Sequence, residues 1–103
     1  MLLVNTDFIS GKEIETIGLV SGAMIQSKHM GKDIGSAFKT VVGGELKAYS
    51  EMLNESRQIA TQRMVDAANQ MGADAIINVR YMTSAVIQGA AEMLAYGTAV
   101  KYK

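Results

Sequence analysis

The chain has 103 residues, the length of one domain with a single core. Ten acidic side chains balance ten basic ones, so it lacks the strong field that nucleic acid or an anionic membrane attracts. It has no cysteine, which excludes disulfides and thiolate chemistry. The start MLLVNTDF lacks the long apolar run of a signal peptide, and no stretch approaches a membrane span. We therefore expect one cytoplasmic domain, residues 1–103, with no nucleic-acid or membrane partner.

Two apolar stretches in the first quarter of the chain predict strands. Residues 2–4 are a short run that suits an edge strand, and Gly11 marks a turn in the polar segment that follows. Residues 15–26, ETIGLVSGAMIQ, alternate as a strand that is apolar or small on both faces. Because Gly18 and Gly22 add no side chain to this strand, we interpret them as close-packing glycines, or as the mark of a bulge.

The middle of the chain predicts two helices separated by glycine. Residues 33–42, DIGSAFKTVV, carry apolar side chains on one helical face, with Asp33 as a candidate N-cap. The glycine pair 43–44 interrupts this short helix, since glycine is unfavourable inside helices. A long helix follows over residues 45–71.

A stripe of apolar and small residues, at steps of three and four, runs along the long helix. Its members are Leu46, Tyr49, Leu53, Ser56, Ala60, Met64 or Arg63, Ala67 and Met71. The stripe fits either a helix that lies on a sheet or a coiled-coil seam. Its small members favour close packing on a sheet. Gly72 then supplies the left-handed residue that commonly ends a helix.

Two further strands follow the long helix. Residues 75–83 and 92–101 each alternate between two faces, and the short link SAVIQGAA between them predicts an antiparallel hairpin. On the second strand Ala95, Gly97 and Ala99 form a face of small residues, with Gly97 as a close-packing glycine. The sequence thus predicts an α+β fold, an antiparallel sheet of three to four strands covered by one long helix that a short helix precedes.

One layer of helix covers a single face of such a sheet. The residues that we assign by alternation to the uncovered face are Val20, Met24, Ile76, Met82 and Met93. Because exposed apolar patches of this kind mark interfaces, we predict a homo-oligomer whose subunits pack sheet surfaces or edges together.

Four segments of the sequence resemble the YbjQ-like family of small bacterial proteins. They are GGELKAY at residues 43–49, SRQIATQRM at 56–64, GADAIINVRY at 72–81 and EMLAYGTAV at 92–100. The resemblance covers essentially the whole chain and implies a dodecin-related α+β subunit that assembles into a ring, with a pentamer implied. The family has no assigned activity, and its label is heavy-metal-binding.

The residue types argue against the metal site that this label suggests. Soft-metal sites use thiolates and imidazoles, and the chain offers no cysteine and one histidine, His29. Asp33 lies four residues further, but we interpret this pair as a solvated helix entry. We interpret six of the eight methionines as core fillers rather than thioether ligands, namely Met24, Met52, Met64, Met71, Met82 and Met93. We predict no metal and no cofactor, and metal binding remains the alternative function.

No arrangement of residues predicts catalysis. Glu51 and Glu55 lie with Gln58 and Gln62 along one helical face, the pattern of an exposed polar side. There is no GxSxG sequence, and the glycines of GLVSGAMIQ lack the spacing of a phosphate loop. We therefore predict a protein that is not an enzyme.

Four polar residues that the family motif shares are the candidate site. They are Glu45, Arg57, Arg80 and Glu92. Arg80 interrupts a nearly apolar strand, and a buried arginine must be paired. We predict that Arg80 pairs at a subunit interface with a carboxylate, Glu45 or Glu92. The alternative is that Arg80 lines a cleft between subunits and binds a small anion. The expected function is thus a ring-forming protein that binds a small ligand at its subunit clefts.

Overall fold

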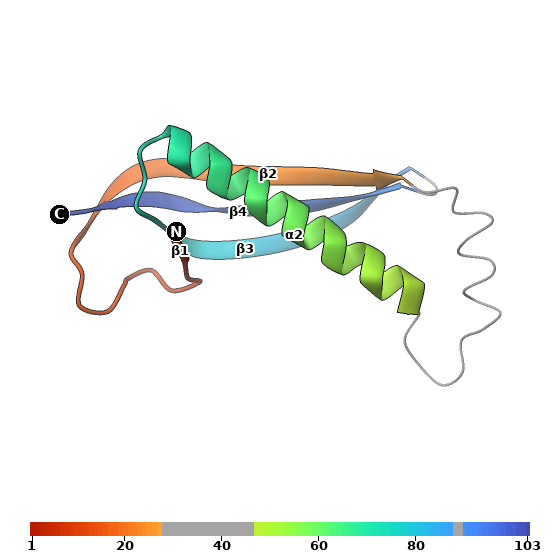
Figure 1. The fold of residues 1–103 in the computed structure, drawn as a ribbon, viewed down its shortest axis with the longest axis horizontal. Coiled ribbons are helices and arrows are strands. Elements are labelled where there is room, and N and C mark those ends of the chain that lie inside the picture. The colour runs from red at the N-terminus through yellow and green to blue at the C-terminus, as the bar shows by residue number, and fades with distance from the viewer. Residues whose placement is uncertain (28–46, 88–89) are drawn as a thin grey trace.

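In the computed structural model, residues 1–27, 47–87 and 90–103 form a four-stranded sheet with one helix across one face (Figure 1). The α+β class is therefore confirmed. The predicted short helix over residues 33–42 lies outside the described residues. The elements in chain order are β1 (Leu2–Leu3), β2 (Ile14–Ser27), α2 (Lys47–Gln70), β3 (Ala75–Ile87) and β4 (Ala90–Tyr102).

The sheet has the strand order β1-β3-β4-β2. β4 is antiparallel to both of its neighbours, which confirms the predicted hairpin and makes β2 and β3 run in the same direction. β1 is parallel to β3, with Leu2 beside Ala75. The prediction of a purely antiparallel sheet is therefore wrong at β1. A run of three apolar residues predicts a strand but carries no information about its direction.

The hairpin is longer than predicted. β3 continues to Ile87 and β4 begins at Ala90, so residues 84–87, which we assigned to the link, are strand. Their register supports this, because Ser84 pairs with Glu92 and Ala85 with Ala91. Alternation is too weak in SAVI to separate strand from loop.

Helix α2 lies on the sheet and, among the described residues, on no other helix. It is buried at regular four-residue steps. The buried positions are Met52, Ser56, Ala60, Met64 and Ala68. The predicted stripe is correct in the middle of the helix but drifts at its end, where Ala68 is buried and Met71 is 39% exposed. Among the described residues, no helix combines the length and the apolar character that crossing a membrane requires.

Two glycines mark places where backbones lie too close for a side chain. At Gly22 a Cβ atom would overlap the Ala60 carbonyl oxygen and the Met64 amide nitrogen of α2. At Gly97 it would lie 2.8 Å from the Ile77 carbonyl oxygen and 2.8 Å from Ile76 Cγ2. The third predicted close-packing glycine differs, because a Cβ at Gly18 would meet only Met71 Cε at an ordinary 3.7 Å.

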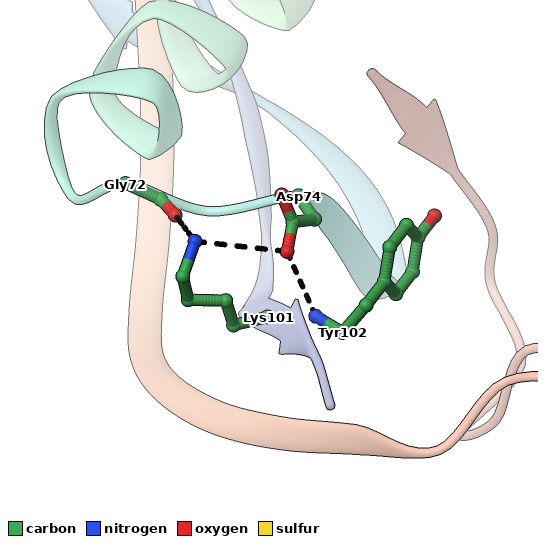
Figure 2. A network of polar contacts seen from close by, with 4 residues as sticks. All are labelled: Gly72, Asp74, Lys101 and Tyr102. Carbon is green, nitrogen blue, oxygen red and sulfur yellow. Dashed lines mark hydrogen bonds and ion pairs between the residues drawn. The ribbon is translucent and has the colours of Figure 1, made fainter.

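A polar network joins the end of α2 to the end of β4 (Figure 2). The helix stops at Gly72, whose φ of 77° is left-handed. Lys101 Nζ donates to the Gly72 carbonyl oxygen at 3.0 Å and lies 3.7 Å from Asp74 Oδ2. The Tyr102 amide also donates to Asp74 Oδ2, at 2.8 Å. The ion pair is exposed and contributes about 0–1 kcal/mol, so the network mainly fixes where β3 begins beside β4.

The main core lies between α2 and the sheet. Its buried members are Val20, Ala60, Met64, Ala68, Ile76, Val79, Met93, Ala95 and Ala99. Val20, Ile76 and Met93 thus face the helix, and Met24 packs against the same cluster. Our assignment of these four residues to the uncovered face is wrong. Alternation sorted the residues of each strand into two faces, but both faces of β2 are apolar, so it did not tell which face the helix covers.

A smaller cluster covers one end of the other face. It consists of Ile9, Ala75, Ile77 and Val100, with Val4, Ile14 and Tyr102 packed against it. The segment between β1 and β2 supplies Ile9, so the start of the chain shields this end of the sheet. The rest of that face has no covering layer among the described residues.

Candidate functional site

The candidate site is the part of the sheet that faces away from α2 and extends along the strands from Ile77, a buried member of the smaller cluster. Cross-strand pairing arranges this open face in rows: Ile77, Thr98 and Leu19; Arg80, Tyr96 and Ser21; Met82, Leu94 and Ala23; Ser84, Glu92 and Ile25. We call these residues the open face. Each row takes one residue from β3, one from β4 and one from β2.

Beyond Ile77, which is buried, the open face carries several exposed apolar side chains. Leu19 is 77% exposed, Ile25 56% and Met82 54%. Large apolar side chains that gather on one uncovered surface mark an interaction site. Met82 was predicted to be a core filler, and so was Met71; both are exposed, so that interpretation is wrong for these two methionines.

A bulge in β3 determines where Arg80 points. The register shifts between Ile77 and Arg80, and Asn78 has a φ of 53°. The Asn78 amide donates to the Thr6 carbonyl oxygen at 2.9 Å. A bulge adds one residue to a strand, which inverts the alternation beyond it. Residues of β3 that follow the bulge therefore face opposite to the simple pattern.

Two contacts confirm this inversion. Val79 joins Ile76 in the core under α2, three residues apart instead of two. The Tyr81 hydroxyl lies 2.9 Å from Thr61 Oγ1 on the helix. Arg80, between Val79 and Tyr81, thus projects to the open face. We predicted Arg80 on one face with Ile76 and Met82; it shares its face with Met82 but not with Ile76.

Among the described residues, the Arg80 guanidinium has only weak partners. Arg80 Nη1 lies 3.4 Å from the Asn5 carbonyl oxygen and 3.5 Å from the Val79 carbonyl oxygen, at the limit of hydrogen bonding. Among the described residues, the ion pair between Lys101 and Asp74 is the only one within 4.0 Å. Arg80 therefore carries an exposed positive charge, with donors to spare, on an apolar surface.

The three predicted polar residues that the structure describes, Arg57, Arg80 and Glu92, do not form one cluster within a chain. Glu92 shares the open face with Arg80 but lies two rows away, a separation of about 13 Å along the strands at 3.3 Å per residue. Arg57 lies on α2, on the other side of the sheet, where it donates to Asn54 Oδ1 at 2.8 Å. Glu45 lies outside the described residues. A pair between Arg80 and a carboxylate thus stays a prediction for contacts between copies.

Arg63 has a role that sequence reasoning missed. Its Nη1 atom crosses from α2 to β2 and donates to the Ala23 carbonyl oxygen at 2.7 Å. The sequence holds no signal for this contact, because it depends on the angle at which the helix crosses the strand. The contact shows that the Ala23 carbonyl is available at the outer side of β2.

The side chains of the described region do not fit a heavy-metal site. Among these residues no group of three or more His, Cys, Asp or Glu lies close enough to hold an ion. His29 and Asp33 lie outside the described residues. The predicted polar side of the long helix is confirmed as exposed: Glu51, Glu55, Gln58 and Gln62 all face solvent. The geometry of the open face suits binding to another surface.

Comparisons with known proteins agree with the fold. A family model named YbjQ, described as "Putative heavy-metal-binding", matches residues 1–103. A UPF0145 protein of Clostridium novyi is 71% identical over 98% of both chains, and one of Alkaliphilus metalliredigens is 67% identical over 99% of both. A crystal structure of a protein of unknown function from Pediococcus pentosaceus, assigned to the DUF74 family, has a TM-score of 0.67 at 15% identity. It covers 100% of this chain and 98% of its own, and it supports the fold alone.

Proposed function

This chain belongs to the YbjQ family, and from that premise we propose that it is a non-catalytic protein that assembles with copies of itself into a ring. The open face is the surface that assembly covers. The number of subunits follows from the resemblance of the sequence, which implies five.

The observation that carries the proposal is the exposure of the open face. Leu19 is the most exposed large apolar residue in the described chain, at 77%, and it lies on the same surface as Ile25 and Met82. At about 25 cal/mol per Å², burial of such side chains contributes roughly 1.5–3 kcal/mol each. The chain has no net charge, so its copies do not repel one another through a long-range field. Electrostatic repulsion therefore does not oppose burial of this surface.

A mass measurement tests the proposal. Light scattering at micromolar concentration should give a multiple of 11.1 kDa. Leu19→Asp should reduce the mass, because it places a charge in the covered surface. Gln58→Asp is the matched control, since it adds the same charge on the exposed side of α2. A monomeric parent protein, or equal masses for both variants, would refute self-assembly.

Arg80 is the polar anchor of this interface. We propose that its guanidinium pairs with Glu92 of a neighbouring copy, because both residues lie on the open face and cannot meet within one chain. Arg80→Met should then weaken assembly or stability by about 3–5 kcal/mol, the expected effect of breaking a buried pair. The exchange Arg80→Glu with Glu92→Arg should restore part of the loss.

A small anion at the subunit cleft is the second candidate for Arg80. The exposed guanidinium, with two weak carbonyl contacts, favours it. In that case Arg80→Met should assemble normally and lose only binding of an anion, for which inorganic phosphate in calorimetry is a suitable probe. Because the described donor set does not fit a heavy-metal site, we propose no metal site here.

A further inference from the structure

The two outer edges of the sheet lack the protection that edge strands usually have. β2 forms one edge along its whole length. At the other edge β1 covers only the start of β3: it pairs Leu3 with Ile76, and the last bond from this side is from the Val79 amide to the Val4 carbonyl oxygen, at 3.0 Å. Among the described residues, positions 81–87 of β3 have no backbone partner on their outer side.

Both edges lack the features that prevent pairing. Residues 16–27, TIGLVSGAMIQS, and residues 81–87, YMTSAVI, contain neither a charged residue nor proline. Charged side chains and prolines are the usual protection of edge strands. The edges also carry the two most exposed large apolar side chains of the described chain, Leu19 at 77% on β2 and Ile87 at 69% on β3. Each edge is therefore suited to receive another strand.

The contact of Arg63 indicates which groups of β2 point outward. Its guanidinium reaches the Ala23 carbonyl oxygen from α2, so the backbone groups of Ala23 are on the outer side. In an antiparallel ladder the amide and carbonyl of a residue point to the same side, and successive residues alternate. Ser21 and Ile25 thus also present their backbone groups outward, while Gly22 bonds to β4.

We infer that the outer edge of β2 in one copy pairs with residues 81–87 of β3 in the next copy, in parallel, so that the copies share one continuous sheet. This inference rests on the proposed self-assembly and identifies its contact. A pair between β2 and β3 uses both of these edges, whereas a two-fold pair of β2 with β2 would leave both β3 edges open. A contact between two different edges is head-to-tail, which is the kind that generates rings.

The parallel direction follows from the sheet itself. β2 and β3 run the same way within a chain, so a copy placed beside β2 with parallel β3 keeps α2 on the same side of the shared sheet. All open faces then lie on the other side, toward the inside of the ring, so the ring encloses the surface that assembly is proposed to cover.

The bond from Arg63 does not block this pairing. Its side chain is exposed, and a hydrogen bond at an exposed site contributes little, so a ladder bond from the next copy replaces it without net loss. The rest of the outer edge of β2 has no such contact among the described residues.

Cross-linking tests which edges meet, because the parent chain has no cysteine. Ser21→Cys and Ser84→Cys change exposed residues of the open face, one on each strand. Treated with a short bismaleimide, the double variant should give a ladder of multiples of 11.1 kDa on a denaturing gel. Each single variant should stay at the monomer mass.

Other outcomes contradict the inference in identifiable ways. Dimers from Ser21→Cys alone would show that β2 pairs with β2, and dimers from Ser84→Cys alone would show that β3 pairs with β3. An assembled double variant that gives no ladder with the short reagent or with bismaleimides of longer spacer would refute the edge contact and leave self-assembly intact. A monomeric parent protein would refute both.

Proline at the edge supplies a second test that does not depend on register. Ser21→Pro removes an outward amide and leaves the bonds to β4 in place, as edge positions allow. Ser21→Thr is the control, since it keeps the amide and suits a strand. Ser21→Pro should lose assembly at micromolar concentration while its circular dichroism matches that of Ser21→Thr. If both variants assemble equally, β2 is not the contact strand.

Discussion

Gly22→Ala should destabilise this protein, although the same change at a compatible site stabilises proteins by about 0.4–1 kcal/mol. At Gly22 the new Cβ overlaps the Ala60 carbonyl oxygen and the Met64 amide nitrogen, and it lies 2.9 Å from the Arg63 carbonyl carbon. Ordinary contact between carbon atoms is about 3.5–4.0 Å, so α2 must retreat by roughly 0.6 Å or more. All three atoms belong to helix backbone, so no side chain can rotate away.

The expected loss is that of overpacking, about 1–3 kcal/mol. For a domain of this size each kcal/mol lowers the thermal midpoint by about 4–8 °C. Thermal unfolding followed by circular dichroism, at one fixed protein concentration, measures the shift. Gly18→Ala is the matched control on the same strand, because its Cβ would meet only the flexible end of Met71 at 3.7 Å. If Gly22→Ala has the same midpoint as Gly18→Ala, the close contact of α2 with β2 is wrong.

Three further changes test other parts of the fold. Gly97→Ala places a Cβ 2.8 Å from Ile76 Cγ2, so its urea midpoint should fall, by about 1–3 kcal/mol in free energy, and an unchanged midpoint would contradict the packing of β3 on β4. Asn78→Val puts a β-branched residue at a φ of 53° and should lower the free energy of unfolding by about 1–3 kcal/mol in the same assay. Asn78→Gly should be tolerated, and equal stabilities of the two variants would contradict the bulge. Asp74→Ala removes the acceptor of the Tyr102 amide, so hydrogen exchange of that amide should accelerate, and unchanged exchange would contradict the bond.

The positions of the elements could be predicted well from the sequence. The strand expected over residues 15–26 is Ile14–Ser27, and the helix expected over 45–71 is described as Lys47–Gln70. The helix has a clear period, the strand is an apolar run, and both have glycine nearby, which is the information that local sequence carries best. The mixed direction of the sheet could not be predicted, since the pairing of β1 depends on where the chain returns in space.

The choice of the covered face was the main error, and the residues held a signal for it. Alternation correctly placed Leu19 and Val20 on opposite faces of β2, but both faces hold apolar residues. Size was the better criterion, because a helix can approach a sheet closely only over small residues. Gly22 on β2 and Ala95 on β4 lie beneath Ala60 of the helix in one cluster, and the face with such residues is the one that α2 covers.

The orientation of Arg80 depends on one residue of a bulge. Without the bulge, Arg80 would share a face with Ile76, which is fully buried under α2, and the guanidinium would need a partner inside the core. The left-handed backbone at Asn78 turns it to the open face instead. Asparagine accepts this conformation more readily than other residues with a side chain, so a polar asparagine within an apolar strand was the only hint in the sequence. The Asn78 amide in this bulge also donates to the Thr6 carbonyl oxygen, which holds the start of the chain against the sheet. Asn78 therefore both turns Arg80 to the open face and fixes the segment that covers the other end of that face.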